Sequence, residues 1–246
     1  MADQARAALA GARARLSTTT RVAALTGAGI SAASGVPTFR GATGSRWEDY
    51  EPAQLATPVA FARDPALVWR WYDWRRGLIA NAAPNPAHEA LARLEAWVRS
   101  VTVITQNVDG LHARAGSSTV IEYHGSIWRT RCLDCGNERE DRRAPLPQLP
   151  PLCPACGGRL RPGVVWFGEA IPADAAAKAE AAARACDLFL VVGTSGAVWP
   201  AAGLARVARE SDAQVIEFNL ERGGVSDEAH LFIAGDAAAT LPMLVP

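Results

Sequence analysis

Four of the five cysteines lie in two matched pairs, a spacing that can hold a metal ion. The motifs Cys132-Leu-Asp-Cys135-Gly and Cys153-Pro-Ala-Cys156-Gly are separated by 17 residues that begin with the first glycine. Each C-x2-C turn directs two thiolates to one point, and four thiolates complete a tetrahedral zinc site with no open position for substrate. We therefore predict one structural zinc ion. Redox dithiols are the alternative, which two pairs at zinc-ribbon spacing disfavour.

A glycine-rich turn, Gly27-Ala28-Gly29-Ile30-Ser-Ala, follows the first apolar run and matches the G-x-G-x-x-G/A fingerprint for dinucleotides. Glycines there permit a tight turn and close approach of the backbone to a pyrophosphate, whose charge a helix N-terminus stabilises. An ordinary strand–helix turn has the same appearance. The acid that NAD dehydrogenases place about 20 residues further on does not follow on a recognisable strand, which disfavours hydride transfer.

Polar side chains follow the second predicted strand, in Thr-Gln106-Asn107-Val-Asp109-Gly-Leu-His112. The carboxyl ends of parallel strands face the ligand cleft in open α/β sheets. Asn107 and Asp109 alternate along the extended chain and so share a face. They could contact a bound ligand, or Asp109 could instead cap the next helical turn.

Of the four histidines, His124 lies where a general base would be useful. It follows the apolar segment Val120–Tyr123 and precedes the cysteine-rich module, at the expected junction of two lobes. Imidazole titrates near neutral pH, which suits proton transfer. A hydrogen-bonded interface histidine is the competing interpretation. We expect His88 and His230 to be structural or exposed, and His112 could be either.

Apolar runs and helical stretches alternate along the chain, which predicts an α/β fold with a doubly wound parallel sheet. Strands are expected over 22–26, 101–105, 188–192, 215–219 and 231–234, and helices over 3–16, 86–98, 172–186 and 200–210, with Pro172 and Pro200 in the first turns of the last two. The tryptophan-rich helical segment 41–83 and the cysteine-rich module 124–163 interrupt this pattern. We expect them to form a smaller zinc-ribbon and helical lobe beside a Rossmann-like domain of residues 1–40, 84–123 and 164–246.

Composition argues against several classes of protein. The 246 residues carry 25 basic and 25 acidic side chains, so bulk charge gives no footprint for nucleic acid or an anionic membrane. No apolar run reaches the ~18 residues that span a bilayer, and the N-terminal segment lacks the apolar core of a secretory signal. Closely paired thiols fit a reducing compartment. We expect a cytoplasmic protein that binds neither membrane nor nucleic acid.

Several motifs occur together in the order and spacing of one family. They are GAGISAASGVPTFR (27–40), TQNVDGLH (105–112), YHGS (123–126), the two C-x2-C pairs, VWFGE (165–169), GTS (193–195) and FN (218–219). Through these motifs nearly the whole chain resembles the sirtuins, which are NAD-dependent protein-lysine deacylases. The resemblance implies NAD as co-substrate, one structural zinc ion and acylated lysine side chains of proteins as substrates. The products would be nicotinamide, the free lysine and O-acyl-ADP-ribose.

By the same resemblance, His124 is the general base, and Asn107 takes part in catalysis. The expected NAD contacts are Gly27, Ala28, Gly29, Ile30, Phe39, Arg40, Gln106, Asn107, Asp109, Gly193, Thr194, Ser195, Asn219, Glu221 and Ala237. A substrate peptide would be clamped as an added strand, opposite residues 196–198, by Val165, Trp166, Phe167 and Gly168. The zinc would order the small lobe and take no part in the chemistry.

One helical segment bears on the choice of acyl group. Tyr72 and Arg75 are three residues apart and share a helix face, where a phenol beside a guanidinium suits a carboxylate. On spacing alone Arg76 would serve equally. The choice of Arg75 rests on resemblance to the desuccinylase/demalonylase branch, whose Y-x-x-R motif aligns here, and Ala56 matches a small residue that widens the acyl pocket there. A surface helix with an aromatic stripe is the alternative.

We therefore expect a deacylase that prefers succinyl- or malonyl-lysine and also accepts acetyl-lysine. A mono-ADP-ribosyltransferase would share the NAD site and differ in acceptor, and a plain deacetylase would make no use of the Tyr72 and Arg75 pair. A zinc-ribbon binding module with a nucleotide-sensing site and an NAD dehydrogenase are the more distant alternatives.

Overall fold

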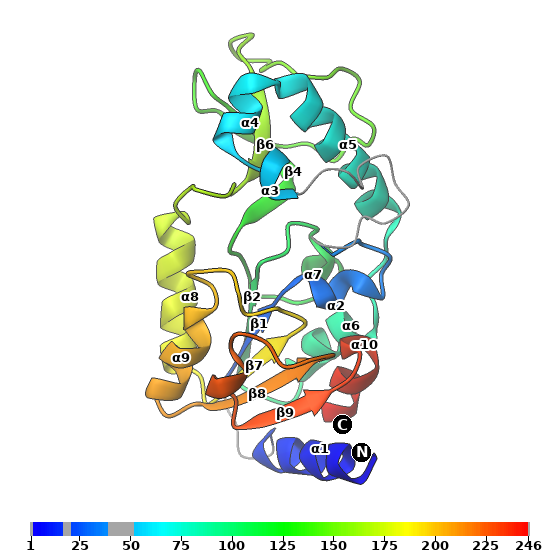
Figure 1. Cartoon of the computed structure of the whole chain (residues 1–246), viewed down its shortest axis with the longest axis vertical. Coiled ribbons are helices and arrows are strands. Elements are labelled where there is room, and N and C mark those ends of the chain that lie inside the picture. Colours follow the sequence, from blue (N-terminus) through cyan, green and yellow to red (C-terminus); the bar gives the residue numbers. More distant parts are fainter. Residues whose placement is uncertain (1, 17–20, 39–51, 246) are drawn as a thin grey trace.

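The computed structural model describes residues 2–16, 21–38 and 52–245 of the chain. Six parallel strands form the main sheet, in the order β3 (Val120–Glu122), β2 (Ser100–Thr105), β1 (Arg21–Thr26), β7 (Leu188–Val192), β8 (Gln214–Asn219) and β9 (Leu231–Ala234). A second, antiparallel sheet has the order β5 (Glu138–Glu140), β4 (Gly125–Cys132) and β6 (Leu160–Val164). Figure 1 shows the two sheets at opposite ends of the molecule.

The strand order of the main sheet fixes where a ligand can bind. From β1 the chain adds β2 and β3 toward one edge, whereas β7, β8 and β9 extend toward the other edge. The direction of winding therefore reverses between β1 and β7. In open α/β sheets the crevice beyond the carboxyl ends of the strands at such a switch point is the usual ligand site.

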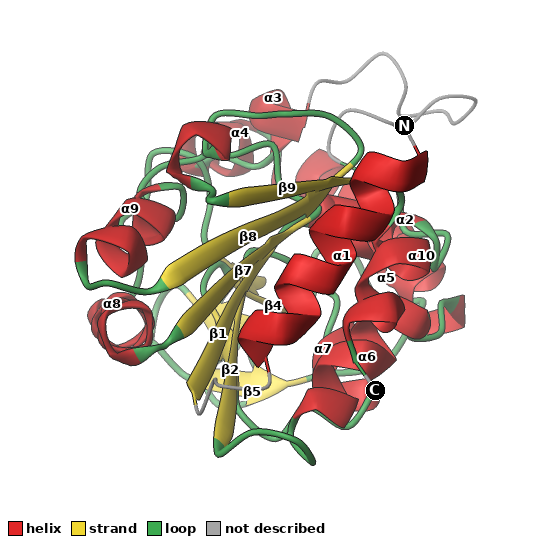
Figure 2. Ribbon diagram, turned by 90° about the horizontal axis from the view of Figure 1, so that it is seen from below, coloured by secondary structure: helices red, strands yellow, loops and turns green. Residues whose placement is uncertain are grey.

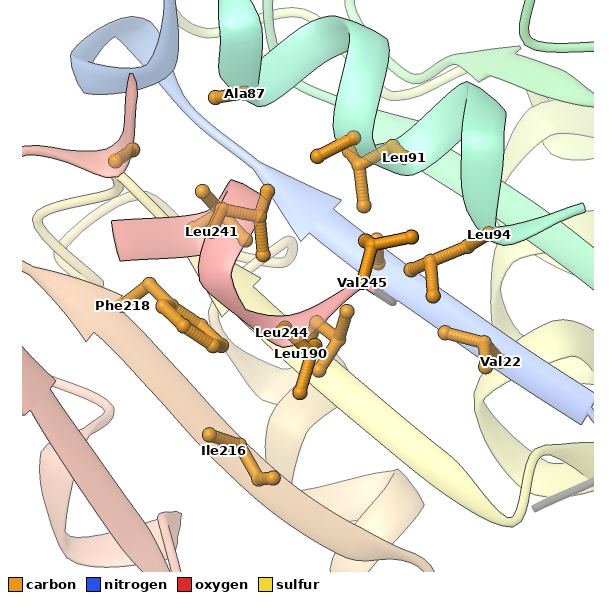
Figure 3. Packing of buried hydrophobic residues seen from close by; sticks show 14 of the residues in the cluster. Val22, Ala87, Leu91, Leu94, Leu190, Ile216, Phe218, Leu241, Leu244 and Val245 are labelled. Atoms are coloured by element: carbon orange, nitrogen blue, oxygen red, sulfur yellow. The ribbon is translucent and has the colours of Figure 1, made fainter. Parts of the chain in front are cut away.

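Alternation along the strands divides the main core into two layers. Val22 and Ala24 face one layer, while Ala23 and Leu25 face the other. The first layer is covered by α1 (Ala2–Leu16), α6 (Pro86–Leu94), α10 (Ala237–Thr240) and η2 (Leu241–Leu244), and the second by α8 (Ala173–Ala185) and α9 (Gly203–Glu210). Figure 2 shows these helices on opposite faces of the sheet, and Figure 3 shows α6 packed over the strands.

A third core lies in the smaller lobe. The helices α3 (Pro52–Leu55), α4 (Pro58–Arg63) and α5 (Pro65–Asn81) pack there with β4 and β6. Side chains of Thr57 and Asp64 accept hydrogen bonds from the first turns of α4 and α5, and a proline follows each of them at the first helical position. The Trp69 indole of α5 donates to the Leu160 carbonyl of β6 at 2.8 Å, which ties helix to sheet.

The five predicted strands are confirmed to within one residue, but β3 was not predicted as a strand. It has three residues, all half-buried, at the edge of the sheet, and so lacks the long buried run that marks the others. Two helix starts were also wrong. Pro172 is the residue before α8, and α9 begins at Gly203, because Gly203 N–H still bonds the Pro200 carbonyl in a tighter turn.

Other boundaries differ by small amounts. The first helix begins at Ala2, and α6 ends at Leu94, four residues before the predicted end, because the chain continues there as turns. The remaining short elements are α2 (Ala28–Ala32), α7 (Leu111–Arg114) and η1 (Ser226–Glu228). Within the described ranges, every helix is too short or too polar to cross a membrane.

Replacing Leu91 by alanine tests the first layer of the main core. The Leu91 side chain is 0% exposed and packs with η2 and the strands, so Leu91→Ala should lower the free energy of unfolding by about 2–5 kcal/mol through lost contacts and a cavity. Leu220, which is 71% exposed, is the matched control, and Leu220→Ala should change it by less than about 0.5 kcal/mol. Urea unfolding followed by circular dichroism measures both. Equal losses would contradict this packing.

Candidate functional site

The turns after β1 and β7 meet at the switch point of the sheet. Gly27 N–H donates to the Val192 carbonyl at 3.1 Å, and Gly29 N–H donates to the Gly193 carbonyl at 2.8 Å. A Cβ on Gly27 would lie 2.7 Å from the Thr194 Cβ, and one on Gly29 would lie 2.7 Å from the Gly193 oxygen. Both glycines are thus required by contact between two turns, in addition to any close approach to a ligand.

Amide side chains connect these turns to the neighbouring strands. Gln106, after β2, donates through Nε2 to the Thr194 hydroxyl at 3.0 Å. Asn107 donates through Nδ2 to the Gly27 carbonyl at 3.0 Å, and Asn219, the last residue of β8, donates to the Thr194 carbonyl at 2.8 Å. The carboxyl ends of β1, β2, β7 and β8 therefore form one hydrogen-bonded rim.

Ser31 of α2 is the centre of a buried polar network beside this rim. Its hydroxyl donates to Asp109 Oδ2 at 2.8 Å and accepts from Asn107 Nδ2 at 3.0 Å. His88 Nε2 lies 3.3 Å from the same hydroxyl, while the Asn85 N–H donates to His88 Nδ1 at 3.3 Å. This arrangement places the proton of the neutral His88 ring on Nε2, as a third contact to Ser31. Burial lowers the pKa of His88 to about 4, which keeps the ring neutral.

Asp109 takes the capping role that its sequence position allows, while its contact with a bound ligand stays a prediction. Its Oδ1 accepts the Leu111 N–H at 2.9 Å, which caps the turn at α7, while Oδ2 faces Ser31. Burial raises the pKa of Asp109, and the hydrogen bonds from Leu111 and Ser31 and the charge of Arg75 oppose that rise. His112, on the same turn, is also buried; its Nε2 lies 2.9 Å from the Thr26 hydroxyl.

His124 lies between the two sheets, in the link from β3 to β4. Its Nδ1 lies 3.1 Å from the Gln106 carbonyl, an acceptor, so Nδ1 carries the proton and Nε2 keeps its lone pair. Burial lowers the pKa of His124, and the bond to Gln106 only partly opposes that shift. A neutral imidazole with a fixed tautomer is therefore held at the lobe junction, which is the state that a general base requires.

Most of the residues that are predicted to contact NAD lie within the described part of the chain, but Phe39 and Arg40 lie outside it. Ala237 begins α10, which packs against α2 and β8, and so it lies near the switch point. Ser195 and Glu221 are exposed in the loops that follow β7 and β8. Ala28 and Ile30 belong to α2, which starts directly after Gly27. Their roles as NAD contacts stay predictions.

The predicted acyl-pocket residues lie together in the smaller lobe. Tyr72 is buried and accepts a hydrogen bond at 2.9 Å from the Trp166 indole. Phe167 N–H donates to the Ala56 carbonyl at 2.9 Å, which brings α3 against the segment that follows β6. Burial lowers the pKa of Arg75, and the neighbouring Tyr72 and Asp109 oppose that shift, so Arg75 lies within electrostatic reach of both.

Arg76, which spacing alone left as an equal candidate, is engaged elsewhere. Its guanidinium is 0% exposed and donates to the carbonyls of Ile127, Asp141 and Arg143. It also lies 3.7 Å from the Asp141 carboxylate and over the Trp128 ring. Arg76 therefore ties α5 to the antiparallel sheet, which leaves Arg75 as the guanidinium beside Tyr72.

The segment after β6 has less backbone available for a peptide than an open edge strand. The N–H groups of Val165, Trp166 and Phe167 donate to the His124 carbonyl, the Glu169 carboxylate and the Ala56 carbonyl. Pairing with a peptide at these three positions is therefore limited to their carbonyls, and the Trp166 carbonyl already accepts the Glu169 N–H at 3.0 Å. Trp166 turns its side chain into the lobe, whereas Phe167 is exposed and Gly168 has φ of +85°.

A groove of about 470 Å³ runs between the lobes, in the size range of ligand pockets. Glu122 and Gly125, on either side of His124, line it together with Val165 and the start of α8. Four basic and four acidic side chains line the same groove: Arg129, Arg131, Arg161 and Lys178 with Glu122, Glu138, Glu169 and Asp174. Its charge is balanced and favours neither sign of ligand.

The four paired cysteines form one cluster, with all sulfur atoms within 4.8 Å of one another. Cys132 Sγ lies 3.5 Å from Cys156 Sγ, and Cys135 Sγ lies 3.8 Å from Cys153 Sγ. A zinc ion with Zn–S bonds of about 2.3 Å needs sulfur atoms ~3.8 Å apart, whereas a disulfide needs about 2.05 Å. The residues present therefore fit one zinc ion, held by four thiolates without an open position.

Sequence reasoning missed several residues that hold this site in place. Ser31 lies within the glycine-rich motif without having been assigned a role, and His88, expected to be structural or exposed, supports it from a buried position. Arg161 and Glu169 form a two-pronged ion pair behind Trp166. The position of Ser31 inside the glycine-rich motif could have indicated its role. The contact between His88 and Ser31 joins segments 57 positions apart, whereas the Arg161–Glu169 pair spans eight positions.

The fold and site define a Rossmann-like protein with a glycine-rich crevice at its switch point and a cysteine-held small lobe. The profile of the Sir2 family matches residues 27–200. The chain is 54% identical over 220 residues to an NAD-dependent protein deacylase of Aquifex aeolicus, covering 89% of this chain and 92% of that protein. It is 57% identical over 220 residues to NAD-dependent protein deacylase 2 of Pyrobaculum aerophilum, covering 89% and 88%.

Solved structures agree. A Sir2 homologue in complex with NAD superposes with a TM-score of 0.88 at 43% identity, covering 94% of this chain and 90% of that one. A mutant Sir2 homologue in complex with ADP-ribose gives the same TM-score at 42% identity, covering 94% and 93%. This protein belongs to the Sir2 family, the sirtuins, as its sequence motifs indicate.

Replacing Cys135 by serine should release the metal. We expect about one zinc ion per chain in the wild type and a large loss in Cys135→Ser, together with disorder of the small lobe, because metal binding and folding are coupled at such sites. Elemental analysis and near-ultraviolet circular dichroism of the tryptophans measure both effects. Cys186→Ser is the control, since Cys186 is buried outside the cluster, and it should keep the metal. A zinc-free wild type would refute the site.

Proposed function

We propose that this protein is an NAD-dependent protein-lysine deacylase that prefers succinyl- and malonyl-lysine and also accepts acetyl-lysine. The names of its curated relatives support the deacylase activity. The preference rests on one observation. Tyr72 and Arg75 lie buried on the same helix, with the neighbouring Arg76 committed to backbone carbonyls.

The NAD site is proposed at the switch point. NAD supplies the ribose carbon that accepts the acyl oxygen as nicotinamide departs. Gln106, Asn107 and Asp109 would contact its nicotinamide half, and the adenosine half would be held by Gly193, Thr194, Ser195, Asn219, Glu221 and Ala237. The β1 turn, Gly27 to Ile30, would line the pocket, with Phe39 and Arg40 over it. The hydrogen-bonded rim that fixes these side chains before binding supports this assignment.

His124 is proposed as the general base. Its Nε2 would accept a proton from a ribose hydroxyl, while Nδ1–H stays on the Gln106 carbonyl. That carbonyl fixes the ring's orientation and stabilises the positive charge that develops when Nε2 is protonated. Because burial lowers the pKa of His124, the base is ready in its neutral form. Asn107 is proposed to assist by orienting the ribose from the carboxyl end of the neighbouring strand β2.

An acyl carboxylate would complement the buried guanidinium of Arg75. A buried guanidinium has lost hydration and gains from a carboxylate that accepts two of its N–H bonds. Tyr72 adds one hydroxyl bond on the same face, and Ala56, a small residue backed against Phe167, leaves room for the longer acyl chain. Acetyl-lysine ends before this pair, so it would be accepted without using it.

The remaining assignments concern the frame of the enzyme. We propose a large domain of residues 1–40, 84–123 and 164–246 and a small lobe of residues 41–83 and 124–163. The four cysteines would hold a structural zinc ion. Segments 165–168 and 196–198 would clamp the peptide of an acylated protein, through carbonyls at positions 165–167. Closely paired cysteines at metal-ligand spacing fit a reducing compartment, and we propose a cytoplasmic location.

Replacing Arg75 by methionine should separate the acyl classes. We expect nicotinamide release with a succinyl- or malonyl-lysine peptide to fall about 100-fold in kcat/KM, because a buried charge-assisted contact is lost. The acetyl version of the same peptide should lose far less. Nicotinamide release from NAD, measured with the three peptides, gives the comparison. Arg70→Met is the control, since Arg70 is exposed on the same helix.

Two results would contradict this function in different ways. Acetyl activity without succinyl or malonyl activity would show a plain deacetylase and refute the acidic preference. No nicotinamide release with any acylated peptide would refute the deacylase itself.

The acidity of His124 gives a pH prediction. Because burial lowers the pKa of this ring from 6.5, kcat/KM should stay level near neutral pH and fall only below 6.5, as the base becomes protonated. The slope should disappear in His124→Ala, whose residual rate should be about 100- to 10,000-fold lower. A pH–rate profile from 5 to 8 measures this, with circular dichroism to verify folding. An acidic limb above 6.5 would contradict a neutral buried base.

A further inference from the structure

We propose that Trp166 is a positioning residue for acyl selection. Its indole N–H donates a hydrogen bond to the oxygen of the Tyr72 hydroxyl, so this hydroxyl is left to act as a donor toward the acyl end. This inference rests on the proposed function and adds a residue outside the Y-x-x-R motif. It also names the chemistry that the subsite rejects. A terminal group that must itself donate, such as a carboxamide, finds no acceptor from this hydroxyl.

The direction of the hydrogen bond follows from the chemistry of the two groups. Trp166 Nε1 lies 2.9 Å from the Tyr72 oxygen, and both side chains are buried. An indole N–H is a donor only, so Tyr72 must accept. Its own proton is then left for another partner. Burial raises the pKa of Tyr72 to about 12, so the hydroxyl keeps that proton throughout the working pH range.

Trp166 is itself held from several sides. The Arg161 guanidinium carbon lies 3.5 Å from the centre of the indole ring, and the Phe61 ring lies 5.2 Å away, centre to centre. Arg161 is buried and fixed by Glu169, whose Oε2 also accepts the Trp166 backbone N–H at 2.8 Å. A cation is attracted to the face of an indole ring, so Arg161 helps to hold the ring in place. The ring therefore cannot turn away from Tyr72 without breaking these contacts.

The consequence is a subsite made of donors. Arg75 has five N–H donors and no acceptor, and Tyr72 offers only its proton. A succinyl carboxylate, which only accepts, satisfies both. A succinamyl group has nearly the same shape, but an NH₂ group replaces one oxygen. Neither of these two side chains can accept a hydrogen bond from that NH₂ group. A buried polar group left unpaired is costly, so shape alone does not decide between these ligands.

Replacing Trp166 by phenylalanine tests the inference. Steady-state nicotinamide release is measured with succinyl- and succinamyl-lysine versions of one peptide, and the ratio of their kcat/KM values is the readout. In Trp166→Phe the Tyr72 oxygen can accept, so the ratio should fall about 5- to 10-fold. Tyr72→Phe should lower it similarly, and the double variant should lower it no further, because both changes remove the same oriented hydroxyl.

Trp69→Phe is the matched control. It removes one buried indole bond in the same lobe, from Trp69 Nε1 to the Leu160 carbonyl at 2.8 Å, without touching Tyr72. Its melting temperature should fall as in Trp166→Phe, while the ratio stays at the wild-type value. An equal fall of the ratio in both variants would mean that general loosening of the lobe is the cause, and would overturn the proposal.

A second measurement avoids any variant of Trp166 itself. In ¹⁵N-labelled protein the Trp166 indole N–H resonance should shift in Tyr72→Phe, because its acceptor is gone. An unmoved resonance, or an unchanged acyl ratio in a folded Trp166→Phe, would overturn the inference. Failure of the proposed function looks different: the wild type itself would then show no succinyl activity, or Arg75→Met would leave that activity intact.

Discussion

The turns after β1 and β7 approach each other so closely that their glycine positions leave no room for a Cβ atom. A Cβ on Gly193 would lie 2.4 Å from the Ile30 nitrogen, and one on Gly29 would lie 2.7 Å from the Gly193 oxygen. The rest of the site depends on this contact, because the Gly27 carbonyl anchors Asn107 and the residue after Gly193 anchors both Gln106 and Asn219. The glycine fingerprint thus serves the protein's own backbone first, and a nucleotide bound as proposed would meet a rim that is already assembled.

The buried network beside that rim determines which atoms a ligand can meet. Asn107 uses its amide nitrogen for the Gly27 carbonyl and for Ser31, so the group that it could offer a ligand is its carbonyl oxygen, an acceptor. Ser31 gives its proton to Asp109 and accepts from two other groups, which fills its capacity. The cost of burying the Asp109 carboxyl is offset by these bonds. Sugar hydroxyls, which can donate, complement an oxygen held in this way.

Local patterns in the sequence predicted the strands, the zinc cluster and the polar strand ends, because each is encoded within a few residues. The edge strand β3 was missed since three half-buried residues leave no periodic signal. The separate fates of Arg75 and Arg76 could not be read from helical spacing, because the carbonyls that engage Arg76 come from Ile127, Asp141 and Arg143, which are distant in the chain. The bond between Trp166 and Tyr72 spans 94 positions and has no local signature either.

Under the proposed function, these non-local contacts would let a lobe that performs no bond-making step influence the choice of acyl group. The Arg76 guanidinium binds the antiparallel sheet and so fixes the position of α5. The position of α5 in turn fixes the direction of Arg75 and Tyr72. The cysteine cluster joins the turns at the far end of the same sheet, through Cys132 at the end of β4. A pocket that distinguishes acyl ends by hydrogen-bond direction requires side chains that cannot rotate to suit the ligand. In the proposed function, rigidity of the small lobe is therefore part of the acyl preference, and a structural metal would contribute to it without meeting the substrate.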